Sequence, residues 1–407
     1  MRGKSLPLAF RRMGIATALL LATVAAHAGN ERVVYNLPGG SAGGSNPYSK
    51  PIVTATGVIY GTAASGGVKN YGTIFEVNPK AGGGWNARTI HFFKGGSEGS
   101  TPIGNIVFDA AGNLYGVTSA SGGGTVYQLS PNGNGSWTLH TIYSFKSFPD
   151  ANTPYAGLTI DAAGSLYGTT NSGGANGVGA IYKLAPNSDG TWSESVLYSL
   201  GSFSGDGTYT WAEPVFDAAG NLYGTTVSAG SYGSGTVYRL SPNSNGTWTE
   251  TVLHSFTGQA DQGTPKAAVW LDSVGNIFGT ASADGTSVAG TVFELSPNSN
   301  GTWTQKTLHT FGALGDGERP FSGLTPDAAG NLYGTTYIGG AHGAGCVYRM
   351  HPGTGGSWNE SVVYSFTGSS DGNAPGVGVT LGNGGVFYGV TSYGGSAQMG
   401  VVYALKP

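Results

Sequence analysis

The feature that most constrains this chain is a unit that repeats along it at a nearly fixed spacing. An aromatic residue followed by glycine recurs at intervals of 52 to 56 residues. Its seven positions are Tyr60, Tyr115, Tyr167, Tyr223, Phe278, Tyr333 and Tyr388. Periods in this range are typical of solenoids, propellers and repeat arrays. The sequence therefore predicts one repetitive domain instead of the several unrelated domains that 407 residues would otherwise suggest.

Each unit holds four short runs with the composition of β-strands. In the third unit they are residues 157–161, 165–170, 179–185 and 191–200, rich in branched and aromatic side chains. Asp-Ala-Ala-Gly separates the first pair and Pro-Asn-Ser-Asp-Gly the last pair, which predicts compact hairpins. Outside the first 28 residues no apolar pattern has the helical period. Four antiparallel strands per unit predict an all-β fold, a seven-bladed β-propeller.

The two ends of the chain predict how the ring of blades closes. The seventh unit stops after its third strand, at residues 400–407. Residues 31–37 (ERVVYNL) match the fourth strand of the sixth unit, 361–366 (SVVYSF), but have no unit of their own. We expect the N-terminal strand to complete the last blade, which removes the exposed end repeats of an open array. Residues 29–407 are then a single propeller domain.

Several residues that recur in every unit have packing explanations. The glycine after each aromatic lies inside a strand, where glycine marks close approach of another segment, and we expect that segment to be the next blade. A tryptophan begins the fourth strand of six units, and we expect it to pack between blades. His91, His254 and His309 replace the tyrosine found elsewhere in that strand, so we interpret them as structural.

The first 28 residues resemble a secretory signal. Arg2, Lys4, Arg11 and Arg12 precede an apolar run that ends in Ala-His-Ala, a cleavage site. Without them the chain has 14 Lys and Arg against 21 Asp and Glu, and it has no basic cluster, so nucleic acid and anionic membranes are poor partners. The single cysteine, Cys346, excludes an internal disulfide framework. We expect a secreted or periplasmic monomer with no membrane anchor.

Sequence variation between units indicates which face binds a ligand. The loops between strands two and three and the crossovers between units vary, and alternating strand direction places both on one face. Aromatic residues begin the inner strand there, and aromatic rings with a few polar groups are typical of ligand sites. We predict carbohydrate binding, with sealing of the blade junctions as the alternative role of these aromatics. The predicted ligand-binding residues are Tyr48, Tyr155, Tyr209, Trp211, Phe321 and Tyr337.

Two other functions remain open, an enzyme and a protein–protein interaction scaffold. The sequence has none of the common hydrolase, metalloprotease or nucleotide-binding motifs. Polar residues that break the repeat on the variable face are the catalytic candidates. A polysaccharide lyase would use His342 with Arg319 or Lys266, and a glycoside hydrolase would use Glu213 and Glu318 as its two carboxylates.

The crossovers carry an acidic residue in most units, and two roles are open for this residue. It hydrogen-bonds its own turn, or the acidic residues together bind Ca²⁺, which needs six to eight oxygens. We predict no cofactor and keep calcium as the alternative. The residues are Glu98, Asp150, Asp206, Asp261, Asp316 and Asp371.

The tandem unit, as in 327–366 (DAAGNLYGTTYIGGAHGAGCVYRMHPGTGGSWNESVVYSF), resembles the bacterial extracellular GloVer tandem repeat. The resemblance covers essentially all of the chain after the signal. It implies an exported protein, often with a C-terminal surface anchor. This chain ends at Pro407, directly after a strand, and we expect a form without that anchor. The resemblance implies no activity and supplies no catalytic residues.

Overall fold

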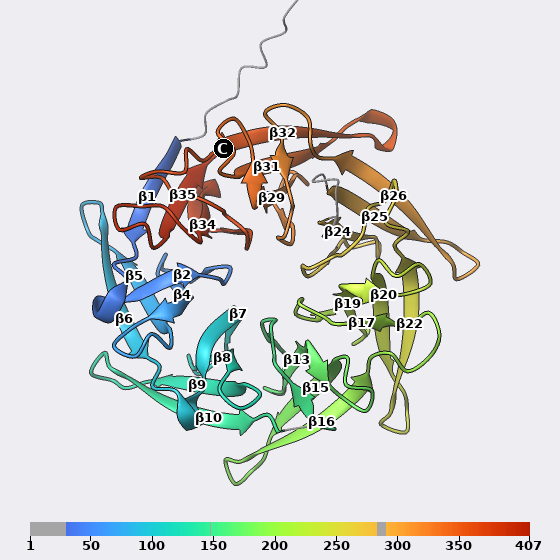
Figure 1. The fold of residues 1–407 in the computed structure, drawn as a ribbon, viewed down its shortest axis with the longest axis horizontal. Coiled ribbons are helices and arrows are strands. Elements are labelled where there is room, and N and C mark those ends of the chain that lie inside the picture. The colour runs from blue at the N-terminus through green and yellow to red at the C-terminus, as the bar shows by residue number, and fades with distance from the viewer. Residues whose placement is uncertain (1–29, 147, 283–289) are drawn as a thin grey trace, which may run out of the picture.

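The chain folds as a ring of seven antiparallel four-stranded sheets (Figure 1). The computed structural model describes residues 30–146, 148–282 and 290–407; the predicted signal lies outside them. This architecture confirms the predicted all-β seven-bladed propeller. Within the described residues, helix is limited to the single turns η1 (Gly40–Ala42), η2 (Gly96–Glu98), η3 (Thr354–Gly356) and η4 (Asn383–Gly385). None of them is long and apolar enough to cross a membrane.

The strands of each blade run in order from the centre of the ring to its outside. The inner strands are β3 (Ile52–Val53) with β2 (Gly44–Pro47), β7 (Ser100–Phe108), β12 (Thr159–Ile160), β18 (Val215–Phe216), β23 (Trp270–Leu271), β28 (Thr325–Pro326) and β33 (Val379–Leu381). The second strands are β4 (Ile59–Gly66), β8 (Leu114–Ala120), β13 (Leu166–Thr170), β19 (Leu222–Thr226), β24 (Ile277–Ala281), β29 (Leu332–Thr336) and β34 (Phe387–Thr391). The third strands are β5 (Thr73–Pro79), β9 (Thr125–Pro131), β15 (Ala180–Pro186), β21 (Thr236–Pro242), β25 (Thr291–Pro297), β31 (Cys346–Pro352) and β35 (Val401–Lys406). The outer strands are β6 (Trp85–Phe92), β10 (Trp137–Ser144), β16 (Trp192–Ser199), β22 (Trp248–Ser255), β26 (Trp303–Thr310), β32 (Trp358–Ser365) and β1 (Asn30–Asn36).

Closure of the ring follows the prediction from the two ends. Strand β1 pairs antiparallel with β35 from Asn30 opposite Lys406 to Asn36 opposite Val401, with one register shift between Val33 and Tyr35. Figure 1 shows the N-terminal β1 lying along the C-terminal β35. The last blade therefore takes its outer strand from the start of the chain, and the ring is closed without a covalent link.

The crossovers and the loops between strands two and three lie on the same face, as predicted. Short strands in three crossovers pair with short strands in the following loops, which requires the two segments to be neighbours. The pairs are β11 (Ala151–Asn152) with β14 (Ser172–Gly173), β17 (Gly207–Thr208) with β20 (Ser228–Ala229), and β27 (Gly317–Glu318) with β30 (Ile338–Gly339). We call this face the crossover face.

The repeated tryptophans pack between blades, as their recurrence predicted. Trp192 of the third blade meets the ring of Tyr115 in the second, with centroids 5.9 Å apart. Trp85 of the first blade meets Tyr388 of the seventh in the same way, at 6.0 Å, across the closure. Each such edge-to-face contact stabilises the packing of adjacent blades, in addition to the stabilisation from the apolar area that the rings bury.

The repeated glycine has a different neighbour from the one predicted. A Cβ built on Gly168 would lie 2.4 Å from the hydroxyl oxygen of Tyr182, the residue directly opposite it on β15 of the same blade. The ring of Tyr182 is fully buried. The expectation that the next blade approaches this glycine is therefore wrong. The large aromatic of strand three occupies the space that a side chain would need.

Replacing Gly168 by alanine should therefore destabilise the third blade. The added Cβ must displace Tyr182 in a closely packed core, and overpacking of this kind costs about 1–3 kcal/mol. Gly133→Ala is the matched control, because nothing lies within 4 Å of a Cβ there and its φ is not positive. Thermal unfolding should show a lower Tm for Gly168→Ala only. Equal Tm values for the two variants would contradict this packing role.

The central cavity as candidate functional site

A cavity of about 560 Å³ lies among the inner strands at the centre of the ring. Two positions of the repeat, two residues apart, supply 13 of the 27 described residues that line it. The first follows each crossover and forms what we call the mouth layer: Tyr48, Ile103, Tyr155, Trp211, Lys266, Phe321 and Gly376. The second lies two residues further along each inner segment and forms the deeper layer: Lys50, Asn105, Gly157, Glu213, Ala268 and Gly323.

Aromatic rings and one lysine make a continuous arc in the mouth layer. Tyr155 stacks on Trp211, with centroids 5.7 Å apart and ring planes 20° apart. The Lys266 ammonium lies 4.9 Å from the centroid of Trp211 and 4.7 Å from that of Phe321. Attraction between a cation and two π faces holds this lysine between the rings. Tyr337 continues the arc beside Phe321, with centroids 5.3 Å apart.

The mouth layer leaves much of its aromatic surface open to a ligand. Tyr48, Tyr155 and Trp211 are 38%, 41% and 38% exposed, although they lie at the centre of the molecule. The indole nitrogen of Trp211 donates to Asn171 Oδ1 at 2.8 Å, which fixes the ring. Burial, with Tyr393 and Tyr155 nearby, raises the pKa of Tyr48, so its hydroxyl stays a neutral donor.

The deeper layer is polar on one side of the cavity. Lys50 reaches across the ring from the first blade, and its Nζ donates to Thr325 Oγ1 of the sixth at 2.9 Å. Its backbone N–H donates to Asn105 Oδ1 at 3.0 Å, and the Asn105 amide in turn donates to Glu213. Burial lowers the pKa of the Lys50 ammonium, and the Glu213 carboxylate opposes that shift. These bonds connect the first, second, fourth and sixth blades.

Sequence reasoning identified the mouth layer but, of the three polar residues in the deeper layer, it found Glu213 and missed Lys50 and Asn105. Glu213 was selected because it stands where other units have Gly or Ala. The same comparison applies to Lys50 and Asn105, which share its register with Gly157, Ala268 and Gly323. A search for repeat-breaking residues at that single register would have found both.

The structure brings two of the five catalytic candidates, Glu213 and Lys266, into the cavity. Glu318 lies in β27 and Arg319 at the end of it, both half-buried. His342 is exposed on the loop after β30. Within the described part of the chain, these three are not among the residues that line the cavity.

The remaining ligand-binding candidates, Tyr337 and Tyr209, are not among the described residues that line the cavity. Tyr337 packs on Phe321, and its backbone N–H donates to the carbonyl of Arg319 at 3.0 Å. Burial raises the pKa of Tyr337 to about 12, with smaller contributions from Tyr393 and Tyr48 and an opposing one from Arg319. Tyr209 is 39% exposed, at the crossover position that Arg319 holds two blades later, and both have positive φ.

The crossover carboxylates occupy separate blade junctions. Each accepts a hydrogen bond from the Tyr or His of the preceding outer strand, as from Tyr198 to Asp206 at 2.8 Å. Five also accept the backbone N–H four residues earlier, as from Ser202 to Asp206 at 2.8 Å. These contacts support the reading that the carboxylate stabilises its own turn. They also support a structural role for His91, His254 and His309.

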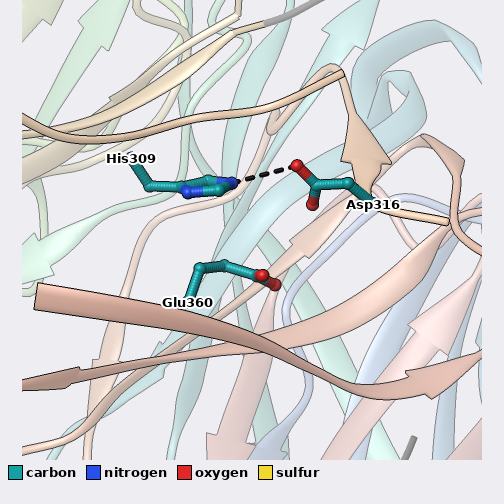
Figure 2. Close-up of side chains that lie close together, drawn as sticks. All are labelled: His309, Asp316 and Glu360. Atoms are coloured by element: carbon teal, nitrogen blue, oxygen red, sulfur yellow. Dashed lines mark hydrogen bonds and ion pairs between the residues drawn. The ribbon is translucent and has the colours of Figure 1, made fainter. Parts of the chain in front are cut away.

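One junction has the composition of a metal site. His309, Asp316 and Glu360 each place a ligand atom within 4.8 Å of the others (Figure 2). His309 Nε2 is already paired with Asp316 Oδ2 at 3.0 Å. The adjacent junction holds the same pair of acids with tyrosine in place of histidine: Tyr364, Asp371 and Glu31. Because a phenol serves equally well there, the cluster is explained as the junction contact of the repeat.

A model of the Gloeobacter/Verrucomicrobia repeat matches residues 21–210 and 193–403. No curated protein matches the sequence.

Two similar solved structures share the fold. One is a polysaccharide lyase of family 25, an ulvan lyase bound to -[GlcA(1-4)Rha3S]-, with 12% identity and a TM-score of 0.51, covering 91% of this chain and 95% of that one. The other is a protein from Lactobacillus plantarum, with 16% identity and a TM-score of 0.50, covering 78% and 85%. At such identities the likeness shows the propeller fold alone.

Proposed function

The chain belongs to the Gloeobacter/Verrucomicrobia repeat family, and we propose that this member binds carbohydrate at the mouth of its central cavity. One observation carries the proposal: large aromatic side chains remain more than a third exposed around the cavity. Packing alone does not explain that exposure, because burying such rings would stabilise the fold. Sugars present C–H faces to aromatic rings and hydroxyls to polar groups, and the cavity offers both.

The arc supplies the apolar contact and its neighbours supply the hydrogen bonds. Tyr155 and Trp211 lie side by side in a fixed geometry, so ordering these side chains on ligand binding costs little free energy. The phenol groups of Tyr48 and Tyr155 and the amide of Asn105 line the same space. The cavity volume of about 560 Å³ lies within the roughly 300–1,000 Å³ of small-molecule sites. These features together favour an oligosaccharide end or a short oligosaccharide as ligand.

Truncating Trp211, one ring of the arc, should weaken glycan binding. We expect the protein to bind at least one class of oligosaccharide on a broad glycan array, and Trp211→Ala to weaken that binding by about tenfold, a loss of about 1.4 kcal/mol. Tyr232→Ala is the control, because Tyr232 is an exposed aromatic on a loop outside the cavity. An array without signal, or equal losses for both variants, would contradict the proposal.

A polysaccharide lyase is the second candidate, favoured by Lys50 in the cavity wall. Burial lowers the pKa of this ammonium, which makes its neutral form a more available proton acceptor. In β-elimination that amine would take the C5 proton of a uronic acid as a C4=C5 double bond forms and the C4–O bond breaks. The leaving oxygen would keep the bonding electron pair and be protonated by the new ammonium group or by water. Incubation with uronate polysaccharides should then produce ultraviolet absorbance of the unsaturated product. Its absence across a broad panel would leave binding without catalysis.

A further inference from the structure

We propose that the ligand is a linear polysaccharide, one end of which occupies the cavity while the following sugars pass outward over the second blade. This inference rests on the carbohydrate-binding function proposed above, and it concerns the length and the direction of the ligand. The cavity has the size of a small-molecule site, so a longer chain must leave it along some path. The rim around the mouth indicates that path.

The loop between the second and third strands is shorter in the second blade than in the other six. Between the last paired residues of these strands, Thr118 and Thr125, it has the six residues 119–124. The corresponding loop has nine residues in each of the other blades, for example 171–179 in the third. Because these loops form the rim of the crossover face, the rim has a gap at the second blade.

The cavity reaches the rim at the same place. Ala64 and Ser119, the first loop residues of the first and second blades, line the cavity, and so does Thr101 in the crossover between these blades. Among the described residues, their counterparts in the other blades are not part of the lining. The cavity therefore opens sideways at these three residues, which we call the notch. The counterparts of Ala64 and Ser119 are Asn171, Val227, Ser282, Tyr337 and Ser392.

Small side chains keep the notch open. In the sixth blade the residue at the register of Ser119 is Tyr337, whose ring packs on Phe321 of the mouth layer, with centroids 5.3 Å apart. Ser119 is too short to cover the mouth in this way, and its hydroxyl donates to the Thr101 carbonyl at 3.3 Å. Ala64 has only a methyl group. The notch therefore offers room beside the mouth that a large side chain occupies in the sixth blade.

Exposed aromatic side chains are confined to the crossover face, which suits a ligand that extends beyond the cavity. Among the described residues there are nine, in the mouth layer, in crossovers and in loops between second and third strands. Single exposed apolar residues are normal on any surface, but a one-sided distribution indicates a binding face. Three belong to the mouth layer, and the other six are Tyr71, Phe148, Phe203, Tyr209, Tyr232 and Tyr393.

Two of these six lie on either side of the short loop. The carbonyl of Tyr71 accepts the backbone N–H of Thr101 at 2.9 Å, so Tyr71 lies next to the notch. Phe148 lies in the crossover on the other side of the loop, where the Thr153 N–H donates to the Gly123 carbonyl at 2.7 Å. Sugars that leave through the notch therefore have an exposed aromatic side chain on each side of their path.

The deeper layer closes the other end of the path. Lys50 reaches from the first blade to Thr325 of the sixth, and Asn105 of the second blade donates to Glu213 of the fourth. A linear chain cannot pass through the ring without breaking these hydrogen bonds. The ligand therefore enters by one end, and its remaining sugars leave on the crossover face.

Oligosaccharides of different length test the inference. We would measure calorimetric affinities of disaccharides and hexasaccharides from the cellulose, xylan, chitin and polygalacturonate series. In at least one series the hexasaccharide should bind about tenfold tighter than the disaccharide, because the sugars beyond the cavity gain contacts at the notch and on Tyr71. Long chains of that series should bind one protein each, since only an end of the chain fits the cavity.

Substitutions at the notch locate the path. Ser119→Tyr introduces the side chain that the sixth blade has at this register, and it should reduce the ratio of hexasaccharide to disaccharide affinity to near one. Replacing residues 119–124 by a copy of 171–179 restores the rim and should do the same, and Tyr71→Ala should reduce the ratio several-fold. Val227→Tyr is the matched control, because Val227 holds the same register in the fourth blade and does not line the cavity. Thermal melting identifies any variant that fails to fold.

The outcomes separate this inference from the proposed function. If disaccharides bind and hexasaccharides bind no tighter, the extended ligand is wrong and carbohydrate binding stands. If hexasaccharides bind tighter but Ser119→Tyr, the exchanged loop and Tyr71→Ala all keep that ratio, the path over the second blade is wrong. Several proteins bound along one long chain would contradict entry by an end. If no oligosaccharide of either length binds, both proposals fail together.

Discussion

A chain without residues 30–37 should lose its cooperative fold. Strand β1 is the outer strand of the seventh blade, and its removal exposes the whole edge of β35. It also removes Val34 and Leu37, which are 9% and 1% exposed in the core. Burial of two such side chains contributes about 1.5–3 kcal/mol each, before the hydrogen bonds of the strand are counted. Because the free energy of unfolding of a native protein is typically about 5–15 kcal/mol, this loss is a large fraction of it.

The same strand, moved to the other end, should restore the fold. Lys406 faces Asn30 in the register that Ala185 and Ser193 have in the third blade. A copy of residues 187–192 placed after Pro407, followed by residues 30–37, therefore rebuilds the missing hairpin. Circular dichroism should show a sharp thermal transition for the native and rearranged chains and none for the truncated one. A truncated chain that melts like the native protein would refute closure by β1.

The repeat explains why so much of the fold was predictable. Seven copies of one unit average out the ambiguity of any single strand, and the match of 31–37 to 361–366 identified the missing strand directly. The neighbour of Gly168 was mispredicted because glycine inside a strand indicates a close approach without indicating whether the neighbour is another blade or the opposite residue of the same hairpin. Once β13 is paired with β15, Gly168 must face Tyr182, and no reference to another blade is needed.

The site was less predictable because it is made by residues from distant blades. Thr325 meets Lys50 across 275 positions of sequence, a contact that depends on the curvature of the ring. A residue that differs from its counterparts in the other units is a candidate for function, and this criterion led to Glu213. The same criterion does not tell where in the blade such a residue lies. His342 also breaks the repeat, yet it lies exposed at the tip of a loop. Register within the blade separates these two cases, because Glu213 follows a crossover at the start of an inner segment and His342 lies in a loop between the second and third strands.

Raising the pH from 5 to 9 should destabilise the ring at its blade junctions. Four glutamates of the outer strands are partly buried beside a crossover aspartate, and at least one oxygen of each is buried without a hydrogen-bond partner among the described residues. Burial, and then the neighbouring aspartate, raises the pKa of Glu250 to about 8 and that of the other three to about 7. The four are Glu31, Glu194, Glu250 and Glu360.

The direction of the effect follows from linkage between protonation and folding. A glutamate pKa raised above its ordinary value of 4.5 means that the folded state favours the neutral acid. Its stabilising contribution is complete below pH 4.5 and is lost as the pH rises through 7 to 8. With a discount for partial exposure, each group should contribute on the order of 1 kcal/mol to the loss. At the junction that holds Glu31, Asp371 opposes this effect only at acid pH, because hydrogen bonds outweigh burial and hold the pKa of Asp371 low.

At the junction between the fourth and fifth blades, the chain has a neutral glutamine in the place of the glutamate. Gln305 faces Leu295 in the register in which Glu194 faces Leu184. Replacing all four glutamates by glutamine should therefore be tolerated, and it should remove most of the loss in Tm between pH 5 and 9. Gln305→Glu makes the converse test, because it should leave Tm unchanged at pH 4 and lower it at pH 9. Parallel pH profiles for the native chain and both variants would show that these carboxyl groups do not couple protonation to the stability of the ring.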